Sequence, residues 1–255
     1  MSDSDFFILT RVFLFLLIFA RVTGMLLFMP VIGGKELPQQ IRFFGAIAFS
    51  LLIASIFWST PMNLPDNILV GAVAVAAEFL IGLTFSAAMY FFFATLYMAG
   101  DYIGRLGGFS ISTMFDPATG ENVPTLSKFF FLAGVALFIS LGGMESFLTG
   151  FIDSFQTLAP GQSVFSPKVT DMLVSLLGTS MILVIKIAAP VTVATLTVFL
   201  VIGILGRAIP QLNVMSLAFG LNSMLVLAVL FLGLGFSMRC FAQSMESLFQ
   251  TIFAK

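Results

Sequence analysis

The chain has 255 residues, of which 59% are hydrophobic and 9% are charged, and its formal net charge is −1. A soluble domain carries about a quarter charged residues because its surface faces water, so this composition indicates a protein of the lipid bilayer. The chain has a single cysteine, Cys240, which excludes an internal disulfide. It has no histidine, which excludes a histidine-based zinc site and a serine–histidine catalytic pair. The near-neutral charge offers no basic surface for nucleic acid. We therefore expect no enzyme, no metal or cofactor, and no nucleic-acid partner.

The apolar residues gather in six blocks, each at the scale of the roughly 20 residues that cross a hydrocarbon core. The runs are continuous and do not alternate, which favours helices over the strands of a barrel. The sequence thus predicts an all-α, integral membrane-type protein. No polar stretch is long enough for a separate soluble domain, so residues 1–255 are expected to form a single domain. The blocks cover residues 12–32, 41–59, 68–98, 127–150, 172–205 and 213–238.

Two blocks are too long for a plain crossing. The block 68–98 would extend about 46 Å as an α-helix. The block 172–205 is longer still and contains Pro190, which should kink or break it. Such lengths require tilt, a bent hairpin or emergence beyond the lipid, and the sequence leaves these alternatives open.

Three charged residues lie near the middle of apolar blocks: Arg21, Glu78 and Lys186. A charge at the centre of a bilayer costs at least about 2.5–3.5 kcal/mol, so it should face protein, water or a partner. One interpretation is a proton or ion path built on Glu78 and Lys186, as in an autonomous ion or small-solute transporter. A buried ion pair, or snorkelling near a helix end, is favoured over that path.

The longest connection, 100–126, combines glycines with large apolar side chains. Glycines at 100, 104 and 108 are spaced for one helical face and would allow another backbone to approach closely. Exposed apolar side chains in such a connection are unfavourable in water. Two hypotheses explain them equally well on physical grounds: a re-entrant loop packed on its own protein, or a mobile stopper that fills a pore. The apolar residues are Phe109, Ile111, Met114 and Phe115, and the turn Asp116-Pro117 follows them.

In order and spacing, several short motifs are similar to one known family. They are Arg21-Val-Thr-Gly24-Met-Leu-Leu-Phe-Met-Pro30-Val-Ile-Gly33, Glu78-Phe-Leu-Ile-Gly82, Ala99-Gly100-Asp-Tyr-Ile-Gly104, Asp116-Pro117 and Gly206-Arg207-Ala-Ile-Pro210-Gln211-Leu-Asn213-Val214. The chain resembles the FliR family of flagellar type III export-gate proteins and the related SctT-type virulence-secretion proteins. Two places depart from the family pattern. Gly142-Gly143-Met144 stands where an Asn-Gly-His-like turn is common, and Gly220-Leu221-Asn222 stands where Pro-Leu-Lys is common.

The resemblance implies a fold of bent helical hairpins, like a fusion of FliP-like and FliQ-like units. It also implies that one copy joins several copies of FliP and FliQ in a pore for unfolded flagellar proteins, with FlhB in contact and FlhA nearby. The location would be the flagellar basal body in the bacterial inner membrane. Segment 108–124 corresponds to a plug loop.

On this resemblance the expected site residues fall into four groups. They are the plug (Gly108, Phe109, Ile111, Met114, Phe115), the hinge or close-packing glycines (Gly100, Gly104, Gly107), the assembly charges (Arg21, Glu78, Lys186) and the family-motif positions (Asp116, Pro117, Arg207, Pro210, Gln211, Asn213).

Overall fold

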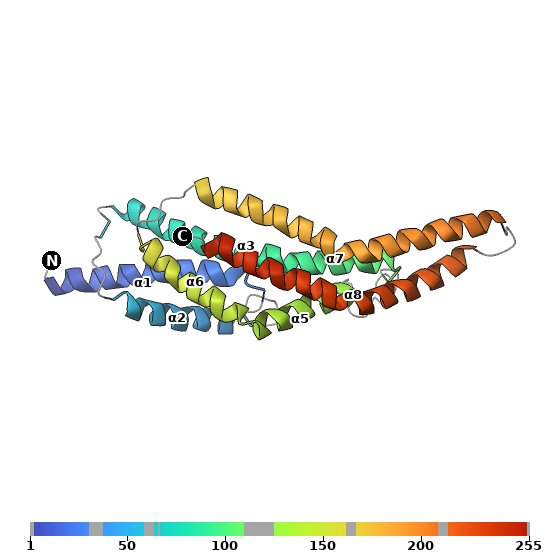
Figure 1. The fold of residues 1–255 in the computed structure, drawn as a ribbon. Coiled ribbons are helices and arrows are strands. Elements are labelled where there is room, and N and C mark those ends of the chain that lie inside the picture. The colour runs from blue at the N-terminus through green and yellow to red at the C-terminus, as the bar shows by residue number, and fades with distance from the viewer. Residues whose placement is uncertain are drawn as a thin grey trace. The chain divides into compact units, whose positions relative to one another are not determined.

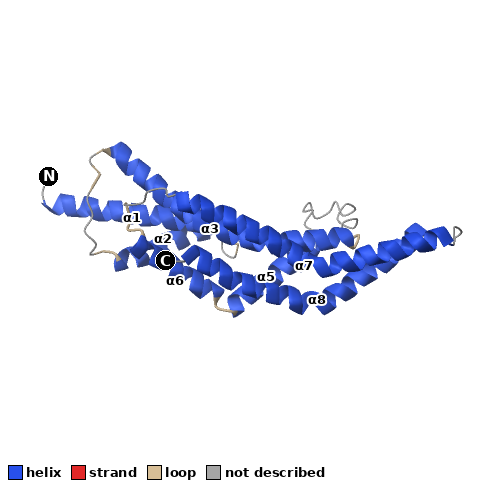
Figure 2. Cartoon of the chain, turned by 45° about the horizontal axis from the view of Figure 1, so that its top comes forward, coloured by secondary structure: helices blue, strands red, loops and turns tan. Residues whose placement is uncertain are grey.

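A computed structural model provides the structure, and it describes residues 3–30, 38–58, 64, 65, 67–109, 125–161, 167–208 and 214–253. Every regular element within these ranges is an α-helix (Figure 2). The helices are α1 (Asp3–Leu27), α2 (Gln39–Ile56), α3 (Ile68–Leu106), α5 (Thr125–Ser140), α6 (Gly143–Thr157), α7 (Pro167–Ala208) and α8 (Val214–Phe253).

Five of these helices, α1, α2, α3, α7 and α8, are long and apolar enough to cross a membrane. The shorter α5 and α6 qualify as a further span only as a pair. The predicted all-α, membrane-type fold with about six long hydrophobic segments is therefore confirmed.

The ends of the helices differ from those of the predicted blocks. The third block was expected to end at residue 98, but α3 continues to Leu106, so Gly100 and Gly104 lie inside a helix. The block 127–150 is interrupted at Leu141 and Gly142, between α5 and α6. Gly142 has a φ of +71°, a conformation that glycine adopts without steric cost. Pro190 lies inside α7 and does not end it.

The described chain forms two compact units, and each is assembled from separate stretches of sequence. The first comprises residues 1–91, 144–176 and 249–255, and the second comprises residues 92–143 and 177–248. The chain passes from one unit to the other inside the long helices α3, α7 and α8, and once more at the start of α6.

The core of the first unit lies among α1, α3 and α6, while α1 and α2 run side by side (Figure 1). Along α6, Phe147, Phe151 and Phe155 are spaced by four residues and are at most 1% exposed, so one face of the helix is fully buried. The Phe151 ring meets Phe85 of α3 edge-to-face, with 5.5 Å between the centroids.

The core of the second unit is a cluster of phenylalanine rings from α3, α5 and α8. Phe92 stacks on Phe241 at 4.4 Å, and Phe93 meets Phe138 edge-to-face at 5.3 Å. The last turns of α7 and the first turns of α8 lie side by side (Figure 1). These two helices expose large apolar side chains, including Phe231 at 82% and Leu232 at 83%. Lipid or other protein must cover such a surface.

Candidate functional site

Helices α1 and α3 touch through their backbones at two glycines of the first unit. A Cβ on Gly24 would overlap the carbonyl oxygen of Phe79, and a Cβ on Gly82 would overlap that of Arg21. Ser86 strengthens the crossing, because its hydroxyl donates to the carbonyl of Gly24 at 3.0 Å. Small residues that allow this approach are typical of helix contacts in membranes.

The close crossing brings two charged residues together. Gly24 follows Arg21 by three residues and Gly82 follows Glu78 by four, so each charge lies one helical turn from a contact glycine. Arg21 Nε lies 2.5 Å from Glu78 Oε2, and both side chains are 0% exposed. The glycine contact therefore positions a fully buried ion pair.

The remaining hydrogen-bonding atoms of the pair hold the end of α6. Arg21 Nη2 donates to the carbonyl of Leu158 at 3.0 Å, and Nη1 donates to that of Ser154 at 3.3 Å. These carbonyls lie at the C-terminus of α6, where a cation is favourable. Ser154 O also accepts the backbone N–H of Leu158, whereas Leu158 follows the last helical residue and its carbonyl lies beyond the helical ladder. Glu78 Oε1 accepts the backbone N–H of Gly161 at 3.0 Å. The guanidinium also lies over the Phe155 ring, 4.3 Å from its centroid.

This network ties α1, α3, α6 and the turn after α6 into one buried assembly. Both carboxylate oxygens of Glu78 already accept hydrogen bonds, so the group is not presented to a solute. Lys186 lies on α7 in the second unit and is exposed. Among the described residues, no three His, Cys, Asp or Glu side chains are grouped to hold a metal ion.

The second notable region is the end of α3, from which the chain continues toward segment 110–124. Gly108 has a φ of +76°. Its N–H donates to Arg105 O at 3.1 Å, and the N–H of Phe109 donates to Gly104 O at 2.9 Å. This is the Schellman arrangement, in which a left-handed glycine ends a helix and satisfies its last carbonyls.

Helix α8 supplies hydrogen-bond donors for the two carbonyls at the end of α3 that the Schellman turn does not satisfy. Asn222 Nδ2 donates to Leu106 O, and Ser223 Oγ donates to Gly107 O at 2.8 Å. The Phe109 ring lies against Gly107, where a Cβ would come within 2.6 Å of the ring. Sequence reasoning noted Asn222 only as a departure from the family pattern and did not single out Ser223.

The glycines of α3 do not form one continuous contact face. Gly100 approaches the backbone of α5, because a Cβ there would lie 2.7 Å from Leu126 O. At Gly104 the nearest atoms are 3.8 Å away, which is ordinary contact. Gly108 lies beyond the last helical residue, so its role is to end the helix.

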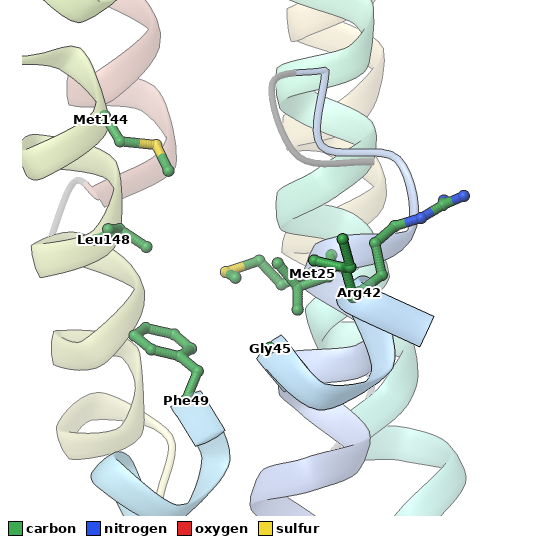
Figure 3. A pocket seen from close by; sticks show the side chains of 8 residues that line it. Met25, Arg42, Gly45, Phe49, Met144 and Leu148 are labelled. Atoms are coloured by element: carbon green, nitrogen blue, oxygen red, sulfur yellow. The ribbon is translucent and has the colours of Figure 1, made fainter. Parts of the chain in front are cut away.

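The first unit also contains an open apolar pocket of about 260 Å³ between α1, α2 and α6. In Figure 3, the side chains of Met25, Phe49 and Leu148 lie around the opening, and that of Arg42 extends away from it. A Cβ on Gly45, which also lines the pocket, would have no atom within 4 Å.

The structure places the other expected site residues as follows. Arg207 lies exposed in the last turn of α7. Eight expected positions lie outside the described residues: Ile111, Met114, Phe115, Asp116, Pro117, Pro210, Gln211 and Asn213.

Comparison with known proteins identifies the relatives of the chain. The sequence model of the family described as bacterial export proteins, family 1, matches residues 12–248. The flagellar biosynthetic protein FliR of Bacillus subtilis (strain 168) is 28% identical over 78% of this chain and 78% of its own length. FliR of Aquifex aeolicus (strain VF5) is 29% identical over 86% of this chain and 84% of its own. The surface presentation of antigens protein SpaR of Shigella sonnei is 27% identical over 91% and 90%.

Proposed function

Because the chain belongs to family 1 of the bacterial export proteins, the family of the flagellar FliR proteins, we propose that it is a subunit of the flagellar type III export gate. In this proposal one copy joins several copies of FliP and FliQ in the inner membrane at the flagellar basal body. Together they form the pore through which unfolded flagellar proteins leave the cell, with FlhB in contact and FlhA nearby. The match over residues 12–248 carries the proposal.

The exposed apolar surfaces of α7 and α8 support an assembly of this kind. Side chains such as Leu200, Ile204 and Phe231 are 69–82% exposed in the chain alone. Neighbouring helical subunits would cover them, as would lipid. A fold that resembles a FliP-like unit joined to a FliQ-like unit would present matching surfaces to both partners.

We assign segment 108–124 to the plug of the closed pore. The support is its apolar content, with Phe109, Ile111, Met114 and Phe115, and its start at the capped end of α3. Apolar side chains in a narrow lumen exclude ions by occupying and dewetting it. The energy for transport comes from other components, because the chain has no nucleotide-binding motif.

Deleting residues 110–115 tests the plug. The variant should assemble with FliP and FliQ at the normal ratio but leak small ions, measured as conductance or solute flux across the membrane. Replacing the same six residues with a serine–glycine segment of equal length separates apolar bulk from loop length, and it should leak as well. Unchanged conductance in both variants rejects the plug. Failure of the full-length chain to co-purify with FliP and FliQ rejects the export-gate assignment.

The alternative, an autonomous transporter that uses Glu78 and Lys186, has no structural support. A transport site requires a carboxylate that can bind or release a solute or a proton. Glu78 is 0% exposed and is bonded to both Arg21 and Gly161, so it serves as a structural charge.

A further inference from the structure

One face of α8 is built around the end of α3. It consists of Phe219, Asn222, Ser223 and Val226, which follow the i, i+3, i+4, i+7 spacing of a single helical face. We call these four residues the α8 clasp. Every member has a contact at the terminus of α3.

The two polar members of the clasp complete the hydrogen bonding of this terminus. Schellman bonds already occupy the carbonyls of Gly104 and Arg105, which leaves those of Leu106 and Gly107. Asn222 donates to Leu106 O, and Ser223 donates to Gly107 O. Asn222 is only 5% exposed, so water is not a ready substitute for its amide.

The two apolar members close the same region sterically. A Cβ on Gly107 would lie 3.1 Å from Val226 Cγ1, and a Cβ on Gly108 would lie 2.5 Å from the Phe219 ring. Val226 is 0% exposed. The last turn of α3 therefore cannot rotate or unwind unless α8 moves or these contacts break.

A buried asparagine at position 222 is energetically unfavourable in one respect. Its Oδ1 is buried and has no hydrogen-bond partner in the described part of the chain, which is unfavourable for a polar group. An apolar residue would avoid that cost but would leave Leu106 O without its donor. The favourable part of the Asn222 side chain in this structure is thus its contact with the end of α3.

We propose that the α8 clasp is a latch that holds the root of the plug, so that opening of the pore requires α8 to release the end of α3. This proposal rests on the assignment of segment 108–124 as the plug. Gly108 and Phe109 are the described residues at the start of that segment, and the N–H of each is part of the capped turn. Displacement of the plug therefore works against the clasp, and Asn222 and Ser223 are positioning residues for the closed state.

The test uses the assembled gate with the double variant Asn222→Leu/Ser223→Ala. Met224→Leu is the matched control, because Met224 is on the same helix but 74% exposed. The measurements are ion flux through the closed gate, assembly with the partner subunits and export of substrate. Flux should rise by about fivefold for each hydrogen bond removed, while assembly and export persist and Met224→Leu behaves like the parent chain.

The deletion of residues 110–115, measured in parallel, separates the latch from the plug. If the deletion variant leaks ions but the double variant does not, the latch is overturned and the plug assignment stands. If the deletion variant does not leak ions, the plug assignment is overturned, and so is the latch that rests on it. Loss of assembly in the double variant, or an equal leak in Met224→Leu, also overturns the latch, since α8 would then serve general folding.

Discussion

Replacing Glu78 with leucine is the sharpest test of the buried network in the first unit. The change leaves the guanidinium of Arg21 at 0% exposure with only neutral polar partners, the carbonyls of Ser154 and Leu158 and the Ser154 hydroxyl. Removing one member of a buried ion pair costs about 3–5 kcal/mol. The N–H of Gly161 also loses its acceptor, but Gly161 is exposed, so water can replace that hydrogen bond at a smaller cost. The two losses share one site and do not add fully, so we expect about 3–5 kcal/mol.

The expected loss is large enough to measure by heating. A change of 1 kcal/mol shifts the Tm by about 2–4 °C in a protein near this size, so the shift should be about 6–20 °C. The assay is the fraction of intact protein that remains after heating in detergent, followed by size-exclusion chromatography. Glu145→Leu is the matched control, because Glu145 lies exposed on α6 of the same unit. It should change the stability by less than about 0.5 kcal/mol.

A double variant, Arg21→Met/Glu78→Leu, distinguishes charge from capping. Removing both charges should restore part of the stability, because an apolar pair can replace a buried ion pair at little cost. Recovery should stay incomplete, since the carbonyl of Leu158 loses the donor that Arg21 supplies. If the Glu78→Leu and Glu145→Leu variants have the same Tm, the network does not stabilise this unit and the reasoning is refuted.

Other substitutions probe separate features. Gly82→Ala should destabilise the chain strongly or prevent folding, because the new Cβ would overlap the backbone of α1. Gly45→Ala should be neutral, because no atom lies within 4 Å of its Cβ position. Equal melting temperatures of the two variants would contradict the close contact between α1 and α3. Phe93→Ala should cost about 3–5 kcal/mol in thermal unfolding, and a loss no greater than that of the exposed Phe231→Ala would argue against the aromatic core. Lys186→Met should leave the stability of the chain within about 0.5 kcal/mol but weaken co-purification with the partners, and full recovery of partners would remove Lys186 from the assembly charges.

The sequence predicts the class and number of the long segments well, because continuous apolar runs leave few alternatives to helices. It predicts their ends less well. Asp101 and Arg105 marked an apparent connection, yet they pair at 2.8 Å one turn apart on α3, which allows polar residues to continue the helix. The break at Gly142 depends on a left-handed conformation that no hydrophobic pattern reveals.

For the candidate site, too, the sequence reveals which residues are unusual but not which residues they contact. Apolar surroundings mark Arg21 and Glu78 as unusual, but nothing local in the sequence states that residues 57 positions apart are partners. Their pairing depends on the contact between Gly24 and Gly82, which is a property of two helices in space. Asn222 could be recognised from the sequence only as a polar residue in an apolar block, because its acceptor lies 116 residues earlier in the chain.

The long separation between Arg21 and its partners also has a consequence for biosynthesis. At about 5–20 residues per second of translation, Glu78 emerges from the ribosome about 3–11 s after Arg21, given the 57 residues between them. The carbonyl of Ser154 follows 133 residues after Arg21. Until α3 is made, the cation of Arg21 therefore lacks its carboxylate partner, and water or another molecule must solvate it.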